Sequence, residues 1–243
     1  MSSSGHGPHS RSGHGVSHGP SQGPVNPLPP AVWLLFLVMV GVELAFQLGT
    51  LGLVGGPQAV GWRLEAVERF TFSGEIFDWM WQSHRWPAEH LVRFVTYPFV
   101  NASMTQMLIA GVMFLAMAKM VAEAMGQVVM LVIFFASAIL GATAYALLTE
   151  GPMPLLGAFP PVYGLIGAFT WMLWRRLSAV GENQARAFSL IGFLMGIQLI
   201  FGLFFDNQND WVADLAGFFT GFALSYPLAP GGWTKVLRRL RQE

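Results

Sequence analysis

The sequence predicts an all-α membrane protein in which six helices cross the bilayer and a long first loop lies in the membrane interface. Of its 243 residues, 53% are apolar and only 11% are charged, and the mean hydropathy is +0.51. Soluble domains usually carry about 25% charged residues. The zero formal net charge indicates no nucleic-acid partner, and the absence of cysteine excludes disulfides and iron–sulfur clusters.

Residues 1–30 are predicted to form a disordered tail. They are rich in Gly, Ser, Pro and His, and Arg11 is their only charged residue. Such a segment buries too little apolar surface to offset the entropy of ordering it. Four of the six histidines lie here, so weak metal binding is the alternative to a plain flexible tail. No other metal site and no cofactor are expected.

Six apolar stretches have about the twenty residues that a helix needs to cross the hydrocarbon core. They fall within residues 31–229, and a short basic tail, 230–243, follows them. The connections after the second span are short, which favours a compact bundle. The six stretches are Ala31–Val54, Asn101–Ala118, Val128–Leu148, Leu155–Trp174, Ala187–Phe205 and Trp211–Ala229.

The first loop, Gly55–Val100, is too polar to cross the membrane and too aromatic for a plain linker. It mixes charged residues with Trp62, Trp79, Trp81 and Trp86. Tryptophan is enriched at the membrane–water interface. The loop is therefore predicted to form short amphipathic helices lying in that interface.

The distribution of Lys and Arg predicts that both termini are cytoplasmic. Membrane proteins concentrate positive charge on the cytoplasmic side. With the N-terminus inside and six spans, nine basic residues fall inside and four outside. Arg63, Arg69, Arg85 and Arg93 are the outer four, all in the first loop. A multi-pass protein of the bacterial inner membrane fits this pattern.

The predicted spans contain few polar features. Glu43 and Asp214 are the acids well inside them. A buried Glu43 needs a partner or a proton, and both a functional role and a packing role are open. Small residues let membrane helices approach closely. Gly217 and Gly221 form such a face in the sixth span, opposite the Gly164 and Gly167 cluster of the fourth.

Three runs of sequence resemble the rhomboid family of intramembrane serine proteases. Arg93–Ser103 (RFVTYPFVNAS) is similar to the segment that leads into the second rhomboid helix. Gly157–Gly164 (GAFPPVYG) and Ala213–Gly221 (ADLAGFFTG) are similar to the fourth and sixth helices. The resemblance covers roughly residues 31–229 and implies a six-helix rhomboid-like bundle. An unrelated six-helix bundle is the alternative.

The resemblance also implies that the catalytic groups are lost. Active rhomboids use a serine at the start of the fourth helix and a histidine on the sixth as its base. A histidine and an asparagine on the second helix help to stabilise the oxyanion. The corresponding residues here are Phe159, Asp214, Gln106 and Ala110, and an earlier histidine has become Asn101.

Other family positions keep a structural role by the same resemblance. Pro160, which has no N–H, follows the nucleophile position, where the family has glycine. Tyr163 stands where an aromatic packs on the catalytic histidine, and its hydroxyl is expected to donate to Asp214. Phe159 is expected to plug the former site. The scaffold positions are Arg93, Gly157, Gly164, Gly217 and Gly221.

The function implied is that of a pseudoprotease, which binds transmembrane proteins within the lipid bilayer without cleaving them. A structural subunit or assembly factor of a membrane complex is the first alternative. An active protease with displaced catalytic groups is the second, although the spans offer Ser137, Ser189 and Ser225 with no histidine beside them in the pattern. The scarcity of charge inside the spans disfavours a transporter.

Overall fold

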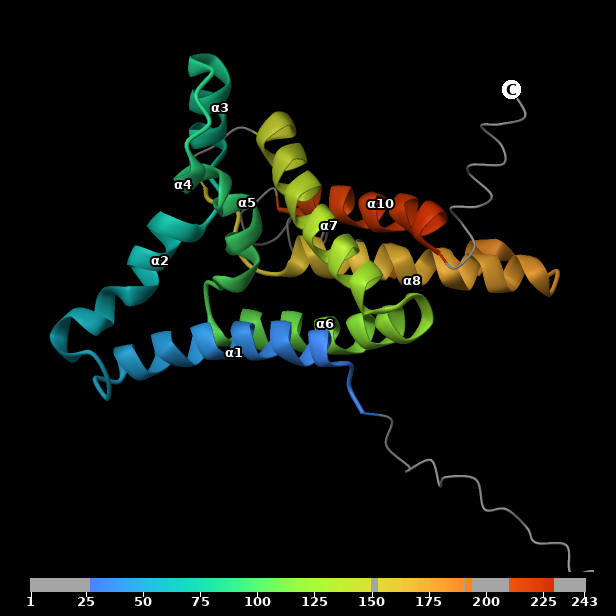
Figure 1. The fold of residues 1–243 in the computed structure, drawn as a ribbon, viewed down its shortest axis with the longest axis horizontal. Helices are drawn as coiled ribbons and strands as arrows, with labels where there is room; N and C mark the ends of the chain where they lie inside the picture. Colours follow the sequence, from blue (N-terminus) through green and yellow to red (C-terminus); the bar gives the residue numbers. More distant parts are fainter. Residues whose placement is uncertain (1–26, 150–152, 190, 194–209, 230–243) are drawn as a thin grey trace, which may run out of the picture.

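The computed structural model describes residues 27–149, 153–189, 191–193 and 210–229, and this part of the chain is mainly helical. The predictions for the N-terminal tail up to residue 26, for most of the fifth span and for the tail 230–243 lie outside it. Figure 1 shows α1 beside α6 and α8 beside α10, with α7 crossing obliquely between the two pairs.

Three of the described helices are long and apolar enough to cross a membrane, which makes this an integral membrane protein. They are α1 (Pro30–Thr50), α6 (Met104–Met125) and α7 (Gln127–Leu148). The predicted fourth and sixth spans correspond to α8 (Phe159–Ala179) and α10 (Trp211–Leu228). Of the predicted fifth span, Ala187–Phe205, the structure describes only the first residues: the short helix η3 (Gln184–Phe188) ends there, and residues 189 and 191–193 are α-helical. The count of six spans stays a prediction.

The predicted bounds of the second span were wrong at both ends. The helix α6 begins only at Met104, because the Ser103 side chain accepts the backbone N–H of Gln106 and caps it. It continues past Ala118, where Lys119 and Glu123 form an i,i+4 ion pair of 3.8 Å. Gly126, at φ +97°, then ends α6 and α7 begins directly.

The fourth span was also predicted to begin too early. Leu155 is extended and pairs with Phe72 of the first loop through two backbone hydrogen bonds of 3.1 and 2.8 Å. Gly157 then adopts φ +90°, a conformation that favours glycine. The helix α8 starts after this turn, with Pro160 and Pro161 in its first turn, where a missing N–H costs least.

The close approach of α8 and α10 depends on glycines. A Cβ on Gly221 would collide with the carbonyl oxygen of Gly164, and one on Gly217 would collide with that of Pro160. Gly167 lies equally close to the backbone of Phe218. Within a bilayer, lipid is as apolar as the side chains, so such contacts stabilise mainly through van der Waals packing.

The first loop forms the predicted series of short helices. Its α3 turns Phe77 and Met80 inward, where they pack with Phe94 and Tyr97 against α7. The loop is therefore docked on the bundle, although α3 projects away from it in Figure 1. The elements are η1 (Gly56–Gly61), α2 (Trp62–Phe70), α3 (Gly74–Ser83), α4 (Ala88–Leu91), α5 (Arg93–Thr96) and η2 (Tyr97–Phe99).

Candidate functional site

The turn before α8 lies against the N-terminal end of α6. A Cβ on Gly157 would stand 2.7 Å from Nε2 of Gln106 and 3.4 Å from Oδ1 of Asn101. The N–H of Gly157 donates to the carbonyl of Tyr97 at 3.1 Å. Two features therefore require glycine at position 157: its positive φ and the close approach of the Gln106 side chain. The turn brings three of the sequence-predicted positions together.

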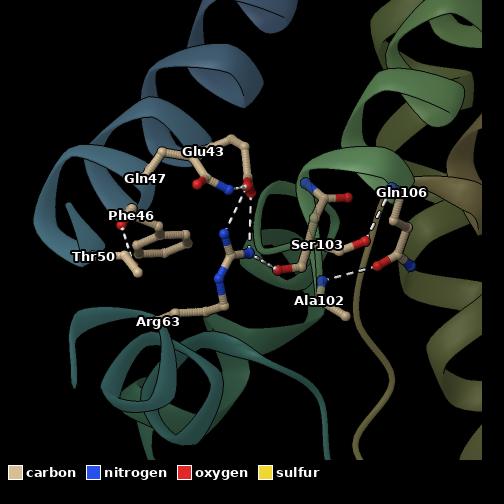
Figure 2. Close-up of polar contacts among 9 residues, drawn as sticks. Glu43, Phe46, Gln47, Thr50, Arg63, Ala102, Ser103 and Gln106 are labelled. Carbon is tan, nitrogen blue, oxygen red and sulfur yellow. Dashed lines mark hydrogen bonds and ion pairs between the residues drawn. The ribbon is translucent and has the colours of Figure 1, made fainter. Parts of the chain in front are cut away.

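Gln106 is held by its own helix end. Its Oε1 accepts the N–H of Ala102 at 2.8 Å (Figure 2). With the oxygen used in this bond, Nε2 is the amide atom closest to Gly157. One turn further along α6, Ala110 is fully buried in the apolar core beside Phe114 and supplies no polar group.

Asn101 is fully buried beside this turn, at 0% exposure. Within the described part of the chain, neither its Oδ1 nor its Nδ2 makes a hydrogen bond. Buried side-chain amides are nearly always hydrogen-bonded to protein or water. The amide of Asn101 is therefore available to a polar group that enters the site.

Phe159 is the first residue of α8. Its ring is partly buried and packs against the apolar core that contains Ala110 and Tyr163. The next residue, Pro160, is buried and gives this position no N–H donor. The start of α8 therefore presents only hydrocarbon side chains at these two positions.

Asp214 lies in the first turn of α10 and is 1% exposed. The helix N-terminus favours a negative charge there. Burial raises the pKa of Tyr97 well above its ordinary value, and the charges of Asp214 and Asp210 raise it further. The Tyr97 hydroxyl donates to the carbonyl of Ala138 at 3.0 Å. Tyr163 is 2% exposed, and its bond to Asp214 stays a prediction.

Arg93 joins two parts of the first loop. Its Nη1 donates to the carbonyl of Thr71 at 3.2 Å, next to the bridge between Phe72 and Leu155. Burial lowers the pKa of Arg93, and the charge of Glu89 opposes that shift. The contact supports a scaffold role, because it fixes the segment that leads into α6.

Sequence reasoning missed the partner of Glu43. This side chain is fully buried, and Arg63 of α2 clamps it with two bonds, Nη2 to Oε1 at 2.6 Å and Nη1 to Oε2 at 3.1 Å. Nη1 also donates to the carbonyl of Asn101 at 2.6 Å, and Gln47 donates to Oε1 of Glu43 at 3.0 Å (Figure 2). A charge inside the first span and an arginine in the interfacial loop were the only signal of this pair.

Comparison with known protein families identifies the family of this chain. The model of the Rhomboid domain matches residues 88–231, more than half of the chain. The match includes the positions of Gln106, Phe159 and Asp214 and extends from α4 beyond the end of α10. A search of curated proteins found no significant match. The chain therefore belongs to the rhomboid family.

Proposed function

We propose that this rhomboid-family protein is a pseudoprotease, which binds other membrane proteins without cleaving them. The observation that carries the proposal is Phe159 at the first position of α8. By the family resemblance, the nucleophilic serine would stand there. A phenyl ring has neither a lone pair to attack a carbonyl nor a proton to give up, so no acyl-enzyme can form at this residue.

The neighbouring positions lack the other catalytic groups. An oxyanion needs preorganised donors around it. Ala110 offers none, and Pro160 has no N–H. Asp214 could accept a proton, but residue 159 has none to transfer. The loss is therefore spread over three helices rather than confined to one substitution.

Part of the site retains the capacity to bind. The buried amide of Asn101 and Nε2 of Gln106 both lie beside Gly157. A buried amide that makes no hydrogen bond costs about 1–3 kcal/mol. An unwound backbone carbonyl of a client helix would satisfy such donors. This favours binding of an extended or unwound segment over simple helix packing.

The proposed orientation places both termini in the cytoplasm of a bacterial cell and the first loop on the opposite side of the inner membrane. The count of Lys and Arg supports it. In this orientation the candidate site lies near the first-loop side, because Gln106 is in the first turn of α6 and Phe159 begins α8. Reporter fusions at Gly181 and at the C-terminus should both report cytoplasm.

Two measurements test the function. A fluorophosphonate probe should leave the purified protein unlabelled, and the buried Ser137→Ala variant should behave identically. Labelling that maps to one serine would show an active protease.

A photo-crosslinking residue at position 159 should capture a membrane protein, whereas one at Val128, which is exposed on α7, should not. Equal capture at both positions would contradict the proposed site, and capture in a fixed ratio would favour a structural subunit.

A further inference from the structure

An apolar groove lies between α1 and the first loop, away from the candidate site. Val38, Val42 and Ala45 of α1 line one side, and Ala66, Phe70 and Thr96 line the other. Its volume is about 400 Å³. The Thr96 hydroxyl is directed to the carbonyls of Phe70 and Val92, at 2.9 and 3.1 Å, so its polar group is already engaged. The groove thus presents hydrocarbon only.

A polar pocket of about 560 Å³ adjoins this groove, and Phe70 lines both. Its charged groups are Arg69, Arg93 and Glu89, with His90 beside them. Nε of Arg93 and Nδ1 of His90 are buried and make no hydrogen bond within the described residues. Arg69 forms an ion pair with Glu65 at 3.3 Å, but both side chains are well exposed, so this pair is weak. Two guanidinium groups therefore face a pocket that contains one carboxylate.

Helices α2 and α5 each place one residue in the lining of the groove and an arginine, three positions away, in the lining of the polar pocket. In α2, Ala66 lines the groove and Arg69 lines the polar pocket; in α5, Thr96 and Arg93 do the same. Residues three apart in a helix are separated by about 4.5 Å along its axis. The boundary between the two environments is therefore sharp and lies at the level of the interfacial helices.

We propose that the groove and the polar pocket together bind one anionic phospholipid. An acyl chain lies in the groove against α1, and the phosphate is held by Arg69 and Arg93. Guanidinium groups match phosphate oxygens in geometry and charge. The groove lies along the half of α1 that is nearer the first loop, which puts the chain in hydrocarbon and the phosphate at the interface.

The test uses the full-length protein in detergent and native mass spectrometry. Dioleoyl phosphatidylglycerol and dioleoyl phosphatidylcholine have the same acyl chains and differ in net charge. Both phosphates can accept hydrogen bonds from the guanidinium groups, but phosphatidylcholine also carries a choline cation that the two arginines repel, so the phosphatidylglycerol should bind about fivefold more tightly. Arg69→Gln, alone and with Arg93→Gln, should remove this preference. Arg85→Gln, an exposed change in the same loop that lines neither pocket, should keep it.

The groove is tested separately from the charges. Ala45→Trp places a ring in the groove and should weaken the binding of both lipids. Leu44→Trp, on a neighbouring exposed position that does not line the groove, should not. Arg93 also donates to the carbonyl of Thr71, which contributes to the fold. If the double variant does not fold for this reason, the lipid preference of Arg69→Gln alone tests the proposed phosphate site. Equal binding of the two lipids, or a preference unchanged by Arg69→Gln, would overturn the proposal, as would indifference to Ala45→Trp.

Discussion

The contact between α8 and α10 is made by backbone and small residues, whereas α1 and α2 are joined by an ion pair whose carboxylate is fully buried. In the first, Gly164 and Gly221 let two helices approach until a single Cβ would collide. In the second, the Arg63 guanidinium holds the carboxylate of Glu43 at 2.6 Å. The first contact is therefore sensitive to an added side chain, and the second is sensitive to the loss of a charged partner.

The largest effect is expected at the charge pair. Arg63→Met leaves the buried Glu43 without its main partner, and breaking a buried pair from one side costs roughly 3–5 kcal/mol. Unfolding by sodium dodecyl sulfate titration should show this loss. The double variant Glu43→Met/Arg63→Met should recover most of it, since no charge is then left buried. Arg85→Met, at an exposed position, is the control. A double variant as unstable as the single one would mean that shape matters here more than charge.

The glycine contact should be the next most sensitive. Gly221→Ala forces α10 away from the backbone of α8, which cannot yield as a flexible side chain can, and should cost about 2–3 kcal/mol. Gly41→Ala is the matched control, because a Cβ on that membrane-helix glycine meets nothing within 4 Å. The same denaturant titration serves for both. Equal stability of the two variants would show that the helices can separate without loss.

The two contacts also differ in how far the sequence could predict them. Glycine spacing identifies a close helix face without any partner, because the signal is local to each helix. The partner of Glu43 is not local: Arg63 follows it only after the turn formed by η1. Nothing in the spacing of the first loop selects Arg63 from its four arginines. The start of α8 was misplaced for a similar reason, since Leu155 is engaged by the distant Phe72.

The candidate site was predictable as a set of positions but not as a set of contacts. The motifs around Gln106, Phe159 and Asp214 could be aligned by their order along the chain. The use of Oε1 of Gln106 by Ala102, and the unpaired amide of Asn101, depend on side-chain orientations that no motif encodes. The degree of burial of Phe159 likewise depends on the packing of neighbouring helices.

A smaller effect is expected at Phe159. The ring is only partly buried against the core, so Phe159→Ala should cost about 1–2 kcal/mol, less than the roughly 3 kcal/mol expected of a fully buried plug. Melting in detergent measures this. Asp214→Asn, which keeps the shape of the side chain, should be tolerated. If Phe159→Ala is neutral and Asp214→Asn abolishes capture of a partner, the region is a binding surface and not a plug.

The smallest effect is a dependence of stability on pH. Asp210 immediately precedes α10, and burial raises its pKa from 3.8 to about 6. The folded protein thus holds this proton more tightly than the unfolded chain does. Its contribution to stability is complete below about pH 4 and is lost as the pH rises to about 6. Since the residue is partly exposed, the change should be about 1 kcal/mol.

Asp210→Asn should remove this pH dependence of the unfolding midpoint, whereas Glu65→Gln, a change at an exposed position, should keep it. A midpoint that instead rises between pH 4 and 6 in the parent protein, and still does so in Asp210→Asn, would place the dominant titration on another carboxyl group.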